Sequence, residues 1–156
     1  MIAGQLQDSK AEFVLCDSDS DALELARNEL GPLADKCTFV QGRVPRVMSR
    51  LKALGKFDLV VAGGLFDYLP NRWIELMVGE IWQHFLHPGG ILFFTNIAQN
   101  NPYRVWMEYL ADWSLIERSE CELEALCHIA GVSDRGVSIT REATNLTLIA
   151  TVTRSN

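Results

Sequence analysis

The sequence has no long apolar segment and no cluster of basic residues. Its longest apolar runs, such as 59–62 and 91–94, are far too short to span a bilayer, and residues 1–10 lack a signal-peptide pattern. We therefore expect a cytoplasmic protein without a membrane span. Fourteen basic against twenty acidic residues give a net charge of -6, and this balance without a basic patch argues against nucleic acid as a partner.

Closely spaced metal ligands are missing as well. The four cysteines lie far apart in the sequence, at Cys16, Cys37, Cys121 and Cys127. This spacing favours reduced core thiols over a disulfide framework or a zinc site. His84 and His87 lie close together, but no third ligand follows at a suitable distance. We expect no metal site, and we interpret these histidines as residues near the end of a helix.

The segment 57–69, FDLVVAGGLFDYL, is the most informative stretch that is present. It begins with consecutive apolar residues, which is typical of a strand covered on both faces in a parallel sheet. Two glycines and a loop with polar residues follow. In parallel sheets ligands bind outside the carboxyl ends of the strands, so residues 63–68 are expected at a ligand site. With 156 residues, 48% of them apolar, the chain predicts one domain.

Two strand and helix units precede this segment. Residues 12–17 predict a strand, and Ser18 is expected to start a helix whose inner face carries Leu23, Ala26 and Leu30. Residues 37–41 predict a second strand, followed by a helix from Pro45 to the glycine at position 55.

The second half of the chain continues with helices and strands. Apolar residues from 73 to 86 recur at helical spacing, 91–95 predict a buried strand, and 96–102 a polar surface loop. The helix expected over 103–110 should turn Val105, Trp106, Tyr109 and Leu110 inward.

The C-terminal part predicts a helix and a hairpin. Ser119 and Glu122 form the pattern of a capping box at the start of a helix. The two strands expected at 137–141 and 146–152 lie so close together that they predict an antiparallel hairpin.

The order of four motifs, EFVLCDSD, FDLVVAGGLFDYL, HPGGILFFTNI and the final helix with its hairpin, resembles class I S-adenosylmethionine-dependent methyltransferases. The resemblance implies an α/β, three-layer Rossmann-like fold with a mostly parallel sheet and a C-terminal antiparallel hairpin. It also implies S-adenosylmethionine as the cofactor. Residues 96–120 further resemble a bacterial subgroup associated with methyl esters of hydroxy fatty acids.

One feature of that family is missing from the sequence. The family begins with a strand and a glycine-rich loop that wraps the methionine part of the cofactor, and nothing before Glu12 supplies either one. Residues 1–10 look like the end of the helix that follows this loop. We therefore expect residues 1–156 to be a single methyltransferase-like domain that is a fragment of a longer protein. The alternative is that the remaining strands close the gap, with help from a second copy in a homodimer.

The resemblance assigns the cofactor to the ends of three strands. A carboxylate at Asp17 can accept hydrogen bonds from both ribose hydroxyls; the alternative is a helix-start carboxylate. Arg43 stands where the family has an acidic or polar residue near the adenine, which leaves Gln41 and backbone groups for the base. Glycines at a strand end allow close approach of a ligand, but they are as often turn residues. The expected cofactor residues are Asp17, Ser18, Gln41, Gly42, Gly63, Gly64 and Leu65.

The acceptor is expected next to the following strand and helix. Asn96, Tyr103 and Arg104 are the candidate substrate-binding residues, and Arg104 would hold a fatty-acid carboxylate. Tyr68 and Glu108 are the candidate catalytic residues, because a hydroxyl or amine acceptor would need a base whereas a carboxylate would not. The alternatives are a Tyr68 ring in the core and a surface ion pair between Arg104 and Glu108.

The resemblance implies methyl transfer from S-adenosylmethionine to a small-molecule or lipid acceptor with a carboxylate or hydroxyl group. A catalytically silent methyltransferase-like domain with an assembly or regulatory role is the alternative, supported by the missing glycine-rich loop. A nicotinamide-dependent oxidoreductase is a third interpretation, because Asp17 would suit that cofactor too. The expected C-terminal hairpin and the lack of its glycine fingerprint argue against it.

Overall fold

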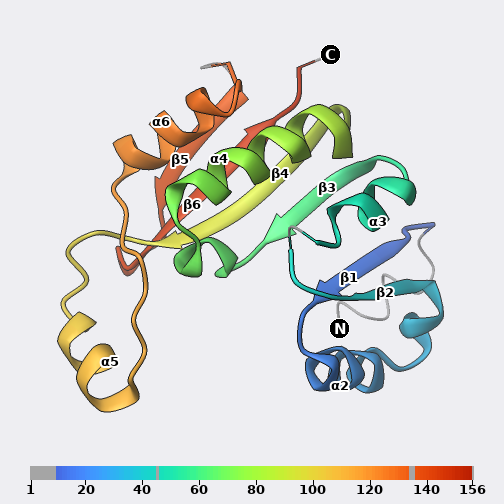
Figure 1. Cartoon of the computed structure of the whole chain (residues 1–156), viewed down its shortest axis with the longest axis horizontal. Coiled ribbons are helices and arrows are strands. Elements are labelled where there is room, and N and C mark those ends of the chain that lie inside the picture. Colours follow the sequence, from blue (N-terminus) through green and yellow to red (C-terminus); the bar gives the residue numbers. More distant parts are fainter. Residues whose placement is uncertain (1–9, 45, 134–135, 156) are drawn as a thin grey trace. The chain divides into compact units, whose positions relative to one another are not determined.

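The computed structural model describes residues 10–44, 46–133 and 136–155 (Figure 1). The helix end expected over residues 1–10 and the helix start expected at Pro45 lie almost wholly outside the described residues. The chain divides into two compact units, Met1–Gly55 and Lys56–Asn156. Each unit is described by itself. Among the described residues, no helix combines the length and the apolar composition needed to cross a bilayer.

The first unit is a small parallel sheet with helices. Its elements are β1 (Phe13–Asp17), α2 (Ser20–Leu30), the 3-10 helix η1 (Gly31–Lys36), β2 (Cys37–Gln41) and α3 (Met48–Ala53). The register places Asp17 opposite Gln41, so the carboxyl ends of both strands lie together. Both strands predicted from the sequence are confirmed.

The start of α2 differs from the expectation. Asp19 rather than Ser18 is the N-cap residue, and its carboxylate accepts hydrogen bonds from the backbone N–H groups of Asp21 and Ala22. A short carboxylate at the N-cap satisfies N–H groups that have no partner inside the helix. Ser18 is therefore left in the turn between β1 and α2, next to Asp17.

The second unit contains a four-stranded mixed sheet in the order β3-β4-β6-β5. Strands β3 and β4 are parallel, and β6 is antiparallel to both β4 and β5. The predicted C-terminal antiparallel hairpin is thus confirmed. The elements are β3 (Phe57–Ala62), the 3-10 helix η2 (Leu65–Tyr68), α4 (Asn71–Glu80), the π-helix η3 (Ile81–Phe85), β4 (Leu86–Ile97), α5 (Arg104–Ala111), α6 (Glu120–Ile129), β5 (Val137–Arg141) and β6 (Thr147–Thr153).

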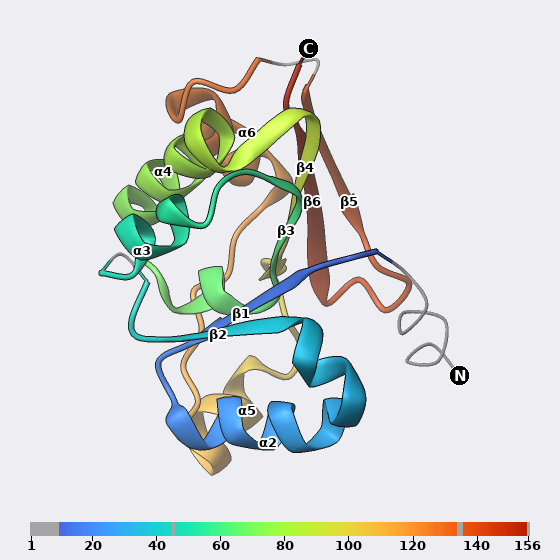
Figure 2. The ribbon, with the colours of Figure 1, turned by 90° about the vertical axis from the view of Figure 1, so that its right-hand side faces the viewer.

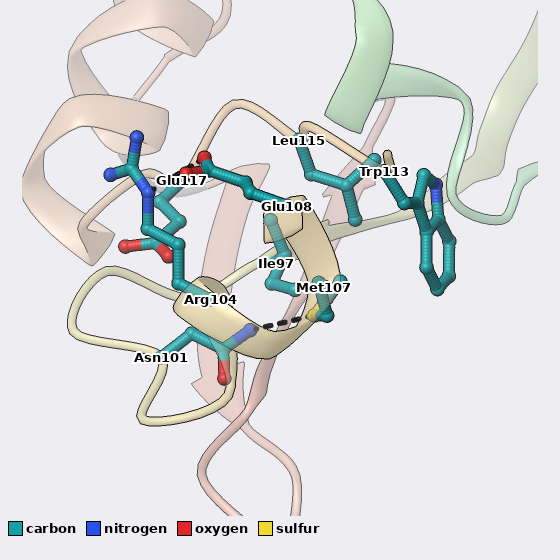
Figure 3. Close-up of a pocket in the computed structure, with 8 residues that line it drawn as sticks. All are labelled: Ile97, Asn101, Arg104, Met107, Glu108, Trp113, Leu115 and Glu117. Atoms are coloured by element: carbon teal, nitrogen blue, oxygen red, sulfur yellow. Dashed lines mark hydrogen bonds and ion pairs between the residues drawn. The ribbon is translucent and has the colours of Figure 1, made fainter. Parts of the chain in front are cut away.

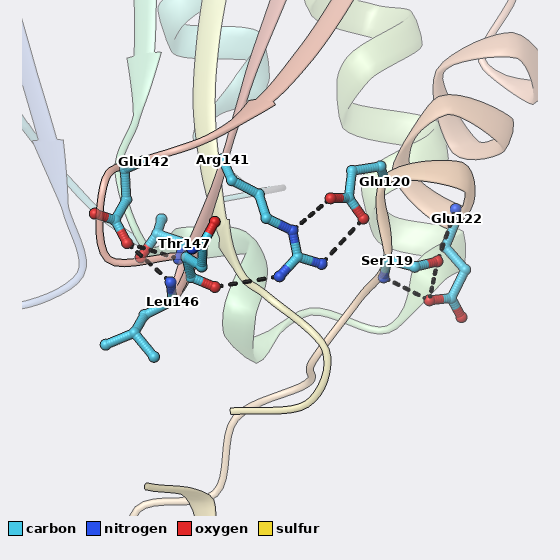
Figure 4. Close-up of polar contacts among 8 residues, drawn as sticks. Ser119, Glu120, Glu122, Arg141, Glu142, Leu146 and Thr147 are labelled. Carbon is cyan, nitrogen blue, oxygen red and sulfur yellow. Dashed lines mark hydrogen bonds and ion pairs between the residues drawn. The ribbon is translucent and has the colours of Figure 1, made fainter. Parts of the chain in front are cut away.

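The core of this unit lies between the sheet and two helices. Figure 2 shows α4 and α6 on the same side of the strands. Alternate residues of β4 and β6 point to that side and are fully buried, as the two-residue period of a strand requires. The rings of Phe66 and Phe94 pack together with 4.8 Å between their centroids. Helix α6 begins with the predicted capping box of Ser119 and Glu122 (Figure 4).

Strand β3 was expected to be buried on both faces, and in this unit it is not. Leu59 is 56% exposed and Val61 is 61% exposed. The described helices of the unit cover one face of the sheet, whereas these two side chains belong to the other face. In addition, β3 is the outermost strand of this sheet among the described residues. The second unit alone therefore does not bury all of the apolar side chains of β3.

Two further elements differ from the sequence expectation. Strand β4 begins at Leu86 and not at Ile91, because Gly89 and Gly90 exchange backbone hydrogen bonds with Arg154. Helix α5 exposes the side chains that were expected to turn inward. It extends beyond the end of β4 (Figure 1), where the described sheet of the second unit does not lie beneath it. The exposed side chains are Val105, Trp106, Tyr109 and Leu110.

Candidate active site

The glycines after β3 shape the first part of the site. Gly64 has a φ of 69°, a left-handed conformation that side chains other than glycine rarely adopt, and it begins the tight turn of η2. Its N–H donates to Oγ1 of Thr95 at 2.8 Å, which ties the ends of β3 and β4 together. A Cβ at Gly63 would meet no atom within 4 Å. The surface at Gly63 is therefore open to a ligand.

The polar residues of the 64–69 loop face the segment that precedes α6. The carboxylate of Asp67 accepts a hydrogen bond of 2.6 Å from the N–H of Ile97, and its backbone carbonyl accepts one of 2.8 Å from Ile116. Burial raises the pKa of Asp67, while the bond from Ile97 and the charge of Arg118 act in the opposite direction. The hydroxyl of Tyr68 is exposed and accepts a bond of 2.8 Å from Nε1 of Trp113.

Arg118, which sequence reasoning missed, connects several segments of the candidate site through buried hydrogen bonds. It is 1% exposed, and its guanidinium donates to Oδ1 of Asn96 and to the backbone carbonyls of Phe66 and Leu69. Burial lowers its pKa, and the negative charges of Asp67 and Glu122 oppose that change. The sequence held no signal for this role, because an isolated arginine before a helix cap is ordinarily exposed.

Asn96 lies at the expected strand end, but its side chain points into the protein. It is fully buried; Oδ1 accepts from Arg118 at 2.6 Å, and Nδ2 donates to the carbonyls of Ile97 and Ile116 at 3.0 and 2.9 Å. Contact with a methyl-accepting substrate would require these bonds to break. Binding of the substrate by Asn96 therefore stays a prediction. In the structure, Asn96 accepts a hydrogen bond from Arg118.

A small hollow lies between α5 and the chain that returns from it (Figure 3). Its volume is about 10 Å³, the space of about one water molecule, so it does not accommodate a substrate as it stands. Arg104 Nε donates to Oε1 of Glu108 at 2.9 Å, which is the surface ion pair named as the alternative. The lining residues are Ile97, Asn101, Arg104, Met107, Glu108, Trp113, Leu115 and Glu117.

The candidate cofactor residues of the first unit lie at the ends of β1 and β2. Asp17 is exposed, and its Oδ1 accepts a bond of 2.9 Å from the N–H of Asp19. One carboxylate oxygen thus supports the local turn, and the side chain remains accessible to a ligand. Gly42 has a φ of 148°, and a Cβ there would lie 2.4 Å from Cγ1 of Val47. Gly42 therefore has a packing reason to be glycine, independent of any ligand.

The structure brings the predicted residues together in two groups. Asp17, Ser18, Gln41 and Gly42 lie at the carboxyl ends of β1 and β2. The second group follows β3 and β4 and consists of Gly63, Gly64, Leu65, Tyr68 and Asn96. Tyr103 is exposed, and its N–H donates to Asn101 at the start of α5. Because the two groups belong to different units, their union in one cofactor site stays a prediction.

Comparison with solved structures identifies the fold. A structure from Bordetella parapertussis, described as a possible exported protein, matches with a TM-score of 0.69 and 19% identity over 93% of this chain and 54% of that one. An O-methyltransferase family protein from Burkholderia thailandensis matches with a TM-score of 0.67 and 12% identity over 99% and 55%. Magnesium protoporphyrin IX methyltransferase from Synechocystis PCC 6803 with bound SAH matches with a TM-score of 0.61 and 16% identity over 93% and 64%.

These likenesses establish the class of fold: an α/β Rossmann-like methyltransferase fold. No family model matches the chain, and no curated protein matches it in sequence. The identities lie far below the level at which a shared activity follows, so the comparisons carry the fold alone. The chain spans between 54% and 64% of the length of these three structures.

Proposed function

We propose that the chain belongs to a methyltransferase that transfers the methyl group of S-adenosylmethionine to a small-molecule or lipid acceptor. The methyltransferase fold, with exposed polar and glycine residues at the carboxyl ends of its parallel strands, is the observation that carries this proposal. Ligands of open α/β sheets bind at those ends. Methyl transfer requires an acceptor held in line behind the methyl group in a site from which water is excluded, so positioning supplies most of the catalysis.

The proposal assigns the nucleoside part of the cofactor to residues at the ends of β1, β2 and β3. In the proposal, the exposed carboxylate of Asp17 accepts hydrogen bonds from the ribose hydroxyls, with Ser18 beside it. Gln41 and the backbone at Gly42 serve the adenine. The open surface at Gly63, with Gly64 and Leu65 following, lets adenosine approach the backbone. For the methionine part, the sequence supplies no glycine-rich loop.

The acceptor side of the proposal rests on the residues around α5 and the 64–69 loop. For a hydroxyl acceptor, Tyr68 and Glu108 are the proposed bases. For a carboxylate acceptor, Arg104 is the proposed partner, and its bond to Glu108 would have to open. The finer proposal is an acceptor of the hydroxy fatty acid class, because the exposed apolar side chains of α5 would suit an acyl chain. Tyr103, at the start of α5, would line the same side.

A catalytically silent domain is the second candidate function. Its motivation is that residues 1–156 include no glycine-rich loop whose backbone N–H groups would bind the methionine part. The methyltransferase structures that the chain resembles do not favour it. In this case the fold would serve assembly or regulation, and a second copy of the chain would be one partner.

Calorimetric titration with S-adenosylmethionine tests the proposal on two samples, the chain alone and the protein expressed from its complete coding region. We expect weak or undetectable binding to the chain alone. Micromolar binding to the chain alone would show that it needs no such loop. If the complete protein neither binds the cofactor nor transfers labelled methyl groups to hydroxy fatty acids or other small acids, the silent alternative holds. A parallel titration with NAD tests the oxidoreductase interpretation.

A further inference from the structure

Arg118 is a buried positive charge that the proposed chemistry does not use. It lies between α5 and α6, directly before the cap of α6, and it is 1% exposed. Burying a guanidinium is costly unless its N–H groups find acceptors inside the protein. The positions of the hydrogen-bond acceptors around the guanidinium group therefore indicate the structural role of Arg118.

The acceptors belong to three different segments. Nε donates to Oδ1 of Asn71, the first residue of α4, at 3.0 Å. Nη1 donates to the carbonyl of Phe66 at 2.9 Å and to Asn96 at the end of β4 at 2.6 Å. Nη2 donates to the carbonyl of Leu69 at 2.6 Å. One planar group thus holds the 64–69 loop, the start of α4 and the end of β4.

The backbone of Arg118 closes the excursion that carries α5. Its N–H donates to the carbonyl of Ile97 at 3.1 Å, and its carbonyl accepts from Gln99 at 2.8 Å. Arg118 also forms a β-bridge with Ala98. Residues 99–117, which we call the α5 lobe, therefore leave the sheet and return to it at the same point (Figure 1).

The lobe and the 64–69 loop also touch each other next to Arg118. Ile116 donates to the carbonyl of Asp67, and Trp113 donates to the hydroxyl of Tyr68, both at 2.8 Å. Tyr68 is 56% exposed and Ile116 is 38% exposed. Arg118, at the root of the lobe, is 1% exposed, and its guanidinium donates to two backbone carbonyls of the loop.

We infer that Arg118 is a positioning residue that joins the 64–69 loop to the root of the α5 lobe, so that the cofactor side and the acceptor side of the candidate site keep one fixed arrangement. Its catalytic meaning rests on the proposed function. An arginine is required because its five donors lie in one rigid plane and reach separate acceptors at once. A lysine offers three donors on a single nitrogen and cannot reproduce that fork.

Hydrogen exchange of the complete chain tests this inference without any ligand. The amides of Gly64, Ile97 and Ile116 report on the joint, because each donates to the loop or to the adjoining strand end. We expect Arg118→Lys to speed their exchange by about tenfold and Arg118→Ala by more, since lysine can keep only some of these hydrogen bonds and alanine keeps none. Amides in the centre of the β5–β6 hairpin should keep their rates.

Two controls separate positioning from general stability. Arg141→Lys makes the same change at an arginine outside the site, which pairs with the carboxylate of Glu120. It should leave the exchange of the three reporter amides unchanged. Asn71→Ala removes a single acceptor and should give a smaller local effect, which keeps the test informative if Arg118→Ala does not fold. Equal acceleration throughout the sheet, or unchanged reporter amides in Arg118→Lys, would overturn the inference.

Methyl transfer is a separate readout. If the complete protein is active, Arg118→Lys should raise the KM for the methyl acceptor. The rise should be larger than any loss of stability, measured as the thermal unfolding midpoint, would cause. It should also be larger than the rise in Arg141→Lys. If no activity is found in any variant, the proposed function fails while the exchange result still decides the role of Arg118.

Discussion

Single carboxylates outside the site have strongly shifted pKa values. Glu120 forms a two-pronged pair with Arg141, and this pair lowers the pKa of Glu120 to about 2 (Figure 4). Glu142 accepts bonds from the N–H and the hydroxyl of Thr144 and from the N–H of Leu146, which lower its pKa to about 2. Both residues bind to the segment that joins β5 to β6, at residues 141–147. Their contribution to stability therefore depends on pH.

The sign of that dependence follows from the direction of the shifts. A carboxylate whose pKa is lower in the folded protein stabilises it fully above the ordinary value of 4.5, and this contribution disappears as the pH falls toward about 2. We expect Glu120→Gln and Glu142→Gln to flatten the fall of the thermal unfolding midpoint over this range, measured by circular dichroism. Glu124→Gln, on the same helix as Glu120, is the matched control. A fall as steep as in the wild type would contradict the assignment.

Two glycines at strand ends should respond differently to substitution. Gly42→Ala places a Cβ against Val47 in a backbone conformation that disfavours side chains, so we expect a loss of about 1 to 3 kcal/mol in the free energy of unfolding. Gly63→Ala meets open space, and its stability should be unchanged within about 0.5 kcal/mol. Urea unfolding measures both. Equal losses in the free energy of unfolding would contradict the expected difference between the two positions.

At the scale of the elements, helix α5 exposes four large apolar side chains, Val105, Trp106, Tyr109 and Leu110. Tyr109 is 85% exposed, and Trp106 is also exposed. Replacing either with serine should change the free energy of unfolding by no more than about 0.5 kcal/mol. By contrast, Phe94→Ala removes a fully buried ring that packs on Phe66 and should cost about 3 to 5 kcal/mol. A large loss in Trp106→Ser would mean that α5 packs against another surface in solution.

The elements also show which parts of the fold the sequence predicts. Apolar runs predicted β1, β2 and β3, and the close spacing of the last strands predicted their antiparallel hairpin. The side chains of α5 were assigned wrongly because helical spacing gives a common face but does not say whether anything lies against it. Arg118 was missed for a related reason: its acceptors come from residues 22 to 52 positions away in the sequence, a pairing that no local pattern encodes.

At the scale of the whole molecule, the described strands form two sheets rather than one. A two-stranded sheet such as β1 with β2 is marginal by itself, and β3 exposes apolar residues on one face. The described residues of each unit therefore leave strand edges or apolar side chains uncovered.

The most direct test of the account is the affinity of the complete protein for S-adenosylhomocysteine, compared between the wild type and Asp17→Ala by calorimetry. We expect the wild type to bind in the micromolar range and Asp17→Ala to bind at least about tenfold more weakly, because hydrogen bonds to a charged carboxylate contribute about 1.5 to 3 kcal/mol. The Gly42 and Gly63 variants report on the two strand ends in the same assay. No binding by the wild type, or equal binding by Asp17→Ala, would contradict the nucleoside site proposed at the ends of these strands.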